Sequence, residues 1–337
     1  MLTLPFATMS ALYPFVFRPL PKERVWGGRR LQELYGKDLP PDRPIGESWE
    51  ISDRPGEASV IANGPLAGRN LRWLMEQHGS ELLGRKTAPA EPFPLLVKIL
   101  DARETLSLQV HPPATKAKEL HGEPKTEMWF VAAAEPGAEL YVGLKRGVTR
   151  KEFESRLTAG TVAECIHRVK VSAGDAMFLP SGRVHALGAG LVIFEIQQNS
   201  DTTYRVFDWN RAGLDGKPRE LHVPQSLASI DFEDIEPALL PRTWTPRAGA
   251  RLRKLVRHEA FNADLWENAA GTRQDLGPGM HILGVVSGSV KVSAPDAEPV
   301  RLSPGHFCLV PASAREAHSE ATSAPATVIV ASLPATR

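Results

Sequence analysis

Two short stretches of the sequence, Thr105–Pro113 and Lys125–Phe130, alternate side chains that can bind a metal or a substrate with apolar ones. If both stretches are β-strands, every second residue points to the same face of the sheet. The polar face would then consist of Ser107, Gln109 and His111 from the first stretch and Lys125, Glu127 and Trp129 from the second. A carboxamide, an imidazole and a carboxylate that converge inside a barrel form a metal site that needs one more ligand. A lone histidine in a strand is more often solvated or hydrogen-bonded, so this hypothesis depends on the rest of the chain.

The composition is that of a soluble globular protein. The chain has 337 residues, of which 42% are hydrophobic and 23% are charged, which is enough for two domains and a substantial core. Its formal net charge of +1 argues against nucleic acid or an anionic membrane surface as a partner. The two cysteines, Cys165 and Cys308, are far apart and have no metal-type spacing, which is typical of reduced structural thiols in a cytoplasmic protein.

The sequence predicts no targeting or membrane segment. Met1–Met9 is mildly apolar but has no basic residues before it, and Pro5 and Pro14 interrupt this region. No long apolar run occurs anywhere in the chain. We therefore expect neither a signal peptide nor a membrane span, and a cytoplasmic location.

The spacing of apolar residues and of turn residues predicts a mainly β fold with a few short helices. Helices are expected over 29–36, 70–83 and 149–158, the last two with capping residues Asn70 and Thr149 at their starts. Strands are expected over 45–52, 58–63, 94–100, 105–113, 125–130, 164–171, 175–180 and 191–197. Lys98 is the only charged residue in its strand, which fits either a sheet edge or a polar pocket.

One segment of the chain is repeated. Val171–His185 has a counterpart in Leu302–His318, and in both a glycine is followed by a largely apolar run, a proline and a histidine. The two glycines are 131 residues apart, and so are the two prolines. Self-similarity at a fixed distance predicts two copies of one barrel-like domain.

The expected domains are a first domain over 1–235, which carries the candidate metal site and includes an N-terminal extension and small helical segments, and a second, metal-free domain over 236–337. Residues 224–246, which contain four prolines, are the expected connection. Nothing in the second copy matches the pattern Gln-x-His followed by Glu, so His306 and His318 are interpreted as surface or core histidines.

The motif Gly-Asp-x-x-x-x-Pro-x-x-x-x-His in the first copy resembles the closing strand and turn of the cupins, which are small double-sheet, jelly-roll β-barrels. The full series of motifs is more particular, because the chain resembles the type I mannose-6-phosphate isomerases in their shorter bacterial form. The matching segments are Arg24–Gly28, Gly46–Ser52, Phe93–Lys98, Ser107–Pro112, Lys125–Trp129, Pro180–Leu187, Gln197–Asp208 and Pro218–His222. Each segment alone is a weak signal, but the ordered series is highly specific.

Carried over position by position, the resemblance implies one zinc ion (Zn2+) per chain, held by His111, Glu127 and His185. Gln109 matches a glutamine that is the fourth ligand in longer members of the family, whereas some shorter members have another residue there. Pro113 stands where the family more often has an aspartate. That aspartate is not a ligand, so the difference affects the loop rather than the metal.

The reaction that the resemblance implies is the interconversion of mannose 6-phosphate and fructose 6-phosphate. Its hard step is removal of the weakly acidic proton from C2 of the open-chain aldose, which gives a cis-enediol. The developing negative charge must be stabilised while a positioned base carries the proton between C2 and C1. A zinc ion with one carboxylate and otherwise neutral ligands keeps about one positive charge, which suits this task.

The substrate phosphate needs fixed cations and hydroxyl donors. The candidates for substrate binding are Arg205, Lys125, Lys98 and Ser107. Arg205 occupies the position of the family's active-site arginine, and it either binds the phosphate or stabilises the enediolate. The two lysines could instead lie on a solvated barrel rim.

The proposed catalytic set is Arg205, Lys125 and Glu50. Glu50 qualifies as the proton carrier if its strand face points inward, and Asp201 is its rival. Either carboxylate could instead orient a metal ligand or an arginine.

Two other classes of function remain open from the sequence. A cupin dioxygenase that uses Fe(II) would need similar ligands, although an apolar aromatic substrate would not need Lys125 and Arg205. A non-catalytic sugar-phosphate-binding cupin would keep the pocket without turnover. The expected partner is a small-molecule sugar phosphate, and the chain is expected to be a monomer or a homodimer.

Overall fold

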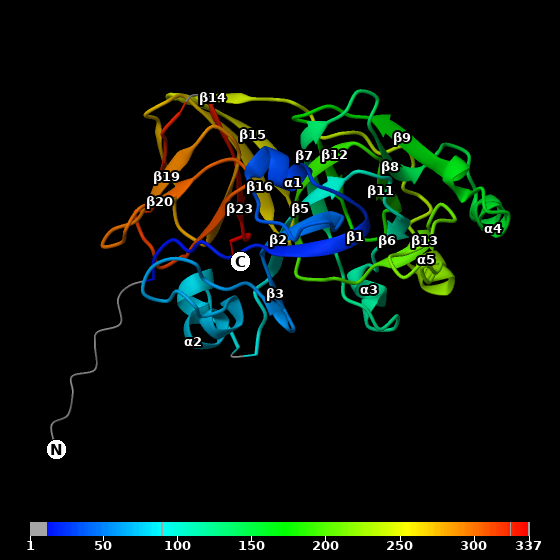
Figure 1. Ribbon diagram of the computed structural model, residues 1–337, viewed down its shortest axis with the longest axis horizontal. Coiled ribbons are helices and arrows are strands. Elements are labelled where there is room, and N and C mark those ends of the chain that lie inside the picture. The colour runs from blue at the N-terminus through cyan, green and yellow to red at the C-terminus, as the bar shows by residue number, and fades with distance from the viewer. Residues whose placement is uncertain (1–11, 89, 324, 336–337) are drawn as a thin grey trace, which may run out of the picture.

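The structure, a computed structural model, describes residues 12–88, 90–323 and 325–335. Its fold is mainly β, with four larger sheets that form two units, one in each half of the chain (Figure 1). Within the described ranges, no helix combines the length and the apolar character that crossing a bilayer requires. The expectation for Met1–Met9 lies outside the described residues.

Two sheets enclose an apolar core in the first unit. The six-stranded sheet has the order β1 (Leu20–Gly28), β2 (Ile45–Ile51), β5 (Leu95–Ala102), β12 (Leu191–Gln198), β7 (Glu127–Ala134) and β10 (Ala176–Leu179). The five-stranded sheet has the order β13 (Tyr204–Phe207), β6 (Leu108–Val110), β11 (His185–Leu187), β8 (Glu139–Leu144) and β9 (Ile166–Lys170). Leu100 and Val131 from the first sheet meet Val142 and Leu187 from the second. Each such fully buried side chain contributes about 1.5–3 kcal/mol relative to exposure.

The second unit has the same design. Its six-stranded sheet has the order β14 (Thr245–Arg247), β15 (Ala250–Arg257), β16 (Asn262–Asn268), β23 (Ala326–Ser332), β18 (His281–Ser287) and β21 (Phe307–Val310). Its four-stranded sheet has the order β17 (Arg273–Asp275), β22 (His318–Ala321), β19 (Val290–Ser293) and β20 (Val300–Leu302). When the strands of each half are matched in chain order, the two six-stranded sheets have identical topology, and β10 and β21 follow the repeated glycines. The repeat predicted from the sequence is therefore a repeat of the fold.

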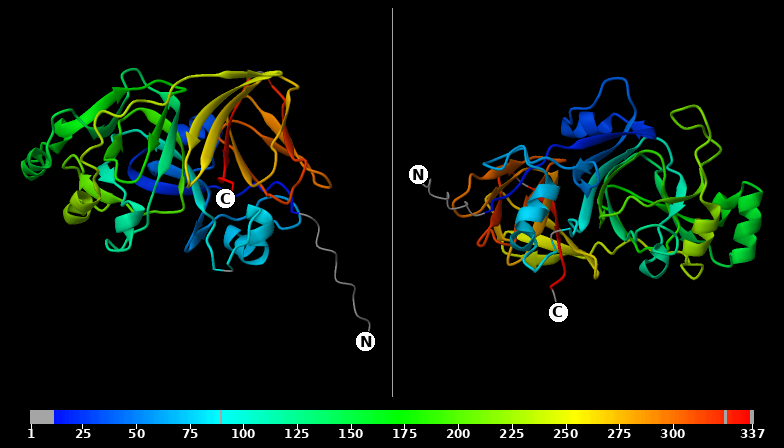
Figure 2. Two further views of the ribbon diagram at one scale, coloured as in Figure 1. Left: turned by 180° about the vertical axis from the view of Figure 1, so that it is seen from behind. Right: turned by 90° about the horizontal axis from the view of Figure 1, so that it is seen from below.

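The two units pack together through their six-stranded sheets. Phe194 on β12 and Phe307 on β21 have ring centroids 5.4 Å apart, and both belong to an apolar cluster that also includes Phe15 and Ile329. Figure 2 shows the units side by side from behind and from below. Residues near the start of the described chain join this contact, because Phe15 pairs with Leu309 on β21.

Short helices and a small hairpin lie around the sheets. They are α1 (Arg30–Tyr35), α2 (Leu71–Leu83), α3 (Ala114–Ala117), α4 (Arg150–Thr158), α5 (Val223–Ser229), the 3-10 turn η1 (Val162–Cys165), and the strands β3 (Asp53–Arg54) and β4 (Glu57–Ala58). The predicted caps are confirmed. The side chain of Asn70 accepts a hydrogen bond from the Trp73 amide at 2.8 Å, and that of Thr149 accepts one from the Glu152 amide at 3.2 Å.

Several predicted strands are shorter than expected, above all the one expected over 105–113, which is reduced to β6 (Leu108–Val110), so that Ser107 and His111 flank the strand. The strand expected over 58–63 is reduced to isolated bridges after β4, because the backbone there bonds to Arg18 on one side and Arg69 on the other rather than to one partner strand. The strand expected over 164–171 starts at Ile166, after η1. His111 keeps a place directly after β6, and the other two changes involve no predicted metal ligand.

A bulge in β1 brings side chains to the site described below. Glu23 and Gly28 both pair with Ile45, so the residues between them leave the ladder with β2. Trp26, in this bulge, packs over Gly46, where a Cβ atom would lie 2.5 Å from the Trp26 ring. Glycine at position 46 therefore lets β1 and β2 approach closely at the pocket wall.

Candidate active site

Two imidazoles and one carboxylate meet at the ends of three strands. His111 directly follows β6, Glu127 begins β7 and His185 begins β11, and one ligand atom from each lies within 4.8 Å of the others. Nε2 of His111 lies 3.5 Å from the Glu127 carboxylate, and Nε2 of His185 lies 3.3 Å from it. Two ligand atoms that are each about 2.1 Å from a tetrahedral metal ion lie about 3.4 Å apart. These separations therefore fit one ion between the three residues.

Both histidines present an Nε2 lone pair to the carboxylate. Nδ1 of His111 lies 2.7 Å from the carbonyl oxygen of Thr202, and Nδ1 of His185 lies 2.9 Å from that of Arg183. Because a carbonyl oxygen can only accept, each Nδ1 is the donor and each neutral ring has an unprotonated Nε2. Metal-binding histidines are commonly held by such a bond from their other nitrogen.

The Glu127 carboxylate has unused acceptor capacity. It is fully buried, and neither oxygen accepts a hydrogen bond within the described part of the chain, although the Lys125 ammonium lies 2.7 Å from Oε2. Burial alone would raise the pKa of Glu127, but the charge of Lys125, together with His111 and His185, lowers it well below its usual value. An ionised carboxylate beside two imidazole lone pairs is a donor set that suits a divalent cation.

Burial also keeps the histidines neutral. It lowers the pKa of His185 to about 3. It lowers the pKa of His111 as well, and the nearby charge of Lys125 adds to this effect. Neutral imidazole is the form that binds metal. For Lys125, burial would lower the pKa, but Glu127 and Glu195 raise it above its ordinary value, so the ammonium stays charged.

Gln109 lies beside this cluster. It pairs directly with His185 between β6 and β11, and with Arg205 between β6 and β13. Its side-chain nitrogen lies 3.3 Å from Nε2 of His185. Rotating the amide by 180° would place its oxygen at this point instead. The four residues that the sequence analysis named as ligands thus lie together.

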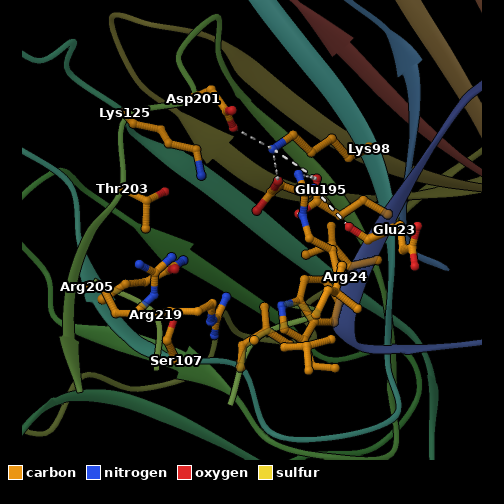
Figure 3. A pocket seen from close by; sticks show the side chains of 18 of the residues that line it. Glu23, Arg24, Lys98, Ser107, Lys125, Glu195, Asp201, Thr203, Arg205 and Arg219 are labelled. Atoms are coloured by element: carbon orange, nitrogen blue, oxygen red, sulfur yellow. Dashed lines mark hydrogen bonds and ion pairs between the residues drawn. The ribbon is translucent and has the colours of Figure 1, made fainter. Parts of the chain in front are cut away.

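A cavity of about 560 Å³ adjoins the cluster. The four predicted substrate-binding residues, Ser107, Lys98, Lys125 and Arg205, all line it, together with Gln109. In Figure 3, Arg205 and Ser107 lie at one end of the pocket and Lys98 at the other. Lys98 is not at a sheet edge, because β5 pairs with both β2 and β12.

Lys98 is surrounded by carboxylates. Its Nζ lies 3.7 Å from Glu47, 3.7 Å from Glu195 and 3.8 Å from Asp201. Burial would raise the pKa of Glu47, but the charge of Lys98 contributes to lowering it to about 2. Burial raises the pKa of Glu195, to which Trp129 donates a hydrogen bond from Nε1 at 2.8 Å. The pocket thus holds one carboxylate that stays ionised and one that takes up a proton more readily.

Glu50 does not reach the pocket, so its predicted role as proton carrier is wrong. The side chain lies on the other face of β2, where it is 2.7 Å from Lys37 Nζ and accepts a hydrogen bond from Ser48 Oγ at 2.6 Å. The residue of β2 that faces the pocket with a carboxylate is Glu47. Every residue of β2 is buried, so the alternation of side chains could not show which face pointed inward.

Some charged residues of the pocket were not singled out by the sequence, among them Glu47, Glu195 and Arg219. Glu195 is the only charged residue in the strand predicted over 191–197, which is the signal that marked Lys98. Arg219 lies in an irregular segment, where sequence spacing gives no direction for a side chain.

The chain is similar to known proteins over most of its length. The family model of the type I phosphomannose isomerase catalytic domain matches residues 15–134. A mannose-6-phosphate isomerase of Streptococcus mutans is 35% identical over 86% of this chain and 89% of its own length. One of Bacillus subtilis is 41% identical over 66% of this chain and 69% of its own length. The crystal structure of the mannose 6-phosphate isomerase from Bacillus subtilis matches with a TM-score of 0.87 at 30% identity, covering 96% of this chain and 100% of that one.

Proposed function

The chain belongs to the type I phosphomannose isomerase family and is an enzyme, and from this premise we propose that it is a zinc-dependent aldose–ketose isomerase. Its substrates would be mannose 6-phosphate and fructose 6-phosphate, which it would interconvert through a cis-enediol. The observation that carries this proposal is the cluster of His111, Glu127 and His185 next to a pocket with several cationic side chains.

His111, Glu127, His185 and Gln109 would hold one zinc ion per chain. When bound, the ion supplies Lewis-acid stabilisation of negative charge on the substrate oxygens. Imidazole and carboxylate ligands also suit iron, so the identity of the metal is part of the test below.

The fixed cations have different tasks in this proposal. Lys125 stays charged beside Glu127, so it adds positive charge where the enediolate develops. Arg205 pairs with Gln109 across the sheet, which puts it beside the cluster and at the pocket wall, where it would bind the phosphate. Lys98 already faces three carboxylates, so it would orient those groups rather than bind a dianion.

Glu195 takes the proton-carrying role in place of Glu50. It lines the pocket, and burial raises its pKa towards the range in which a carboxylate exchanges protons efficiently near neutral pH. A single carrier on one face of the sugar can take the C2 proton and return it to C1. Asp201 is the alternative carrier, but its side chain is 51% exposed and thus less protected from water.

The test is a coupled assay for fructose 6-phosphate made from mannose 6-phosphate, with metal analysis of the same sample. We expect turnover in proportion to zinc content, and loss of both in Glu127→Ala. Glu154→Ala is the matched control, because Glu154 is a partly exposed glutamate on α4 that is not among the residues lining the pocket. Full activity in metal-free Glu127→Ala would refute the proposal. Sugar phosphate binding without product would favour a binding protein, and oxygen uptake by an iron-loaded sample would favour a dioxygenase.

A further inference from the structure

Two arginines, Arg205 and Arg219, line one end of the pocket, and a buried carboxylate, Asp208, lies behind them. Arg219 donates two hydrogen bonds to it, from Nε to Oδ2 and from Nη2 to Oδ1, both at 2.6 Å. Arg211 donates a third from Nε at 3.1 Å. Two guanidinium groups therefore share the single negative charge of Asp208, and Arg205 adds a third positive charge.

Arg205 increases this excess of positive charge. Its Nη1 donates to the backbone oxygen of Glu220 at 2.7 Å, and its Nε is buried without a hydrogen-bond partner in the part of the chain that the structure describes. Burial lowers the pKa of Arg205, and the neighbouring charge of Arg219 lowers it further. The other acidic side chains nearby, Glu104, Asp215 and Glu220, are exposed to solvent, so their charge is screened.

Arg219 reaches the pocket from a hairpin over residues 209–219. An Ala212–Pro218 bridge closes this hairpin. Within the described residues, Nη1 of Arg219 makes no hydrogen bond, so it can face a ligand while Nε and Nη2 hold Asp208. Asp208 thus fixes the orientation of a guanidinium that lines the cavity.

The hairpin is also anchored to the segment that carries Ser107. Trp209 donates from Nε1 to the carbonyl oxygen of Leu106 at 2.7 Å, and Arg211 donates from Nη1 to that of Thr105 at 2.6 Å. In Figure 3, Ser107, Arg205 and Arg219 lie at the same end of the pocket. These contacts place a hydroxyl donor and two guanidinium groups around one volume.

The lysines of the pocket do not compete for the same ligand. Lys125 lies 2.7 Å from Glu127, and Lys98 lies within 3.8 Å of three carboxylates. Their charges are offset inside the protein, whereas the arginine end keeps a net positive charge. A dianion is therefore stabilised most at the arginine end.

We propose that Arg219 is a second phosphate-binding residue, next to Arg205, and that it makes the enzyme select sugars phosphorylated on the terminal carbon over free sugars. Asp208 is the positioning residue that holds the Arg219 guanidinium in place. This inference rests on the proposed function for the identity of the sugar, but the subsite itself is defined by phosphate chemistry.

The test compares Arg219→Ala with Lys217→Ala, which removes one exposed cation from the same hairpin. Hydrogen bonds to charged groups account for factors of about 10 to 100 in binding. In Arg219→Ala we expect KM for mannose 6-phosphate to rise by about this factor and kcat to stay within a few-fold of the wild-type value. The reason is that the bond between Arg219 and the phosphate is present in both the ground state and the transition state. The inhibition constant of inorganic phosphate should rise in parallel. Arg219→Lys should recover part of the loss, because it restores the charge but not the planar fork.

A KM and a phosphate inhibition constant within twofold of those of Lys217→Ala would overturn the assignment. If Arg219→Ala does not fold, Arg219→Lys and Asp208→Asn carry the same test, with a smaller rise in KM expected in each. An unchanged KM in both of these variants would also overturn it. If the wild type makes no fructose 6-phosphate, the proposed function fails, but calorimetric titration with inorganic phosphate still tests the subsite. Equal phosphate affinity in wild type and Arg219→Ala would then overturn this inference alone.

Discussion

The buried Lys125–Glu127 pair permits a quantitative test of the metal centre. The two side chains are 5% and 0% exposed, and their charged atoms are 2.7 Å apart. Glu127→Gln keeps the size of the side chain but removes its charge. In the metal-free protein this leaves the Lys125 ammonium buried without that partner, and breaking such a pair costs about 3–5 kcal/mol in the free energy of unfolding. The same change removes the only charged ligand of the proposed ion.

A second substitution separates stability from metal binding. Lys125→Met should also destabilise the metal-free protein, because it leaves Glu127 unpaired, yet it keeps every proposed ligand and should keep zinc. The double variant removes both buried charges, and replacing a whole pair is often nearly neutral. We therefore expect a coupling energy of about 2 kcal/mol or more between the two sites. The double variant should recover stability but neither metal nor turnover.

The assays are urea unfolding of chelator-treated protein, metal analysis and the coupled isomerase reaction. Glu320→Gln, which breaks the partly exposed Lys291–Glu320 pair in the second unit, is the control and should cost less than about 1 kcal/mol. Stoichiometric zinc in Glu127→Gln would refute the ligand assignment. A coupling energy near zero would refute the argument about burial.

Three further predictions follow from other parts of the molecule. Arg205→Ala should keep its zinc, but its kcat/KM should fall about 100-fold or more, because the change removes charge-assisted bonds to the substrate. Normal turnover of mannose 6-phosphate by this variant would contradict the proposed role of Arg205. Glu50→Gln should lower the free energy of unfolding by about 3–5 kcal/mol, because it leaves Lys37 buried without this partner. The kcat and the zinc content of this variant should stay unchanged. A large loss of kcat in the folded variant would restore Glu50 as a catalytic candidate. Burial lowers the pKa of His281 to about 4, so the unfolded chain takes up this proton first as the pH falls. The corresponding stability is present above about pH 6.5 and declines by about 1.4 kcal/mol per pH unit towards pH 4. The buried His111 and His185 act in the same direction in the wild type, so urea unfolding at pH 7 and pH 5 should show a slope in His281→Gln that is smaller by this contribution.

The faces of individual strands could be predicted from the sequence wherever polar and apolar residues alternate. Ser107 and Gln109 share a face because they are two residues apart, and so do Lys125 and Glu127. In the first of these stretches the opposite face, with Leu106, Leu108 and Val110, is entirely apolar, so the sequence shows which face is polar. His185 was named as a ligand only through the family resemblance, since spacing alone could not show that β11 lies next to β6.

Other residues of the site could not be assigned, for physical reasons. β2 is buried on both sides, so Glu47 and Glu50 look equivalent in the sequence although only one faces the pocket. The position of Arg219 depends on its bonds to Asp208, which lies eleven residues earlier on the other side of an irregular hairpin. A contact of this kind produces no periodic pattern in the sequence, so the spacing of residues could not predict it.

The second unit has the same fold as the first but lacks its central carboxylate. Leu179 pairs with Glu127 in the first unit, and the corresponding Val310 pairs with His281 in the second, so a histidine takes the position of the central carboxylate. Nε2 of His281 donates to the carbonyl oxygen of Leu276 at 2.7 Å, and its buried Nδ1 finds no partner in the described residues. The same strands and register therefore produce a neutral interior where the first unit has an ionised one. In the proposed metal site, attraction for a divalent cation would come from the carboxylate at this one position, and the barrel would contribute by excluding water and by orienting the imidazoles towards it.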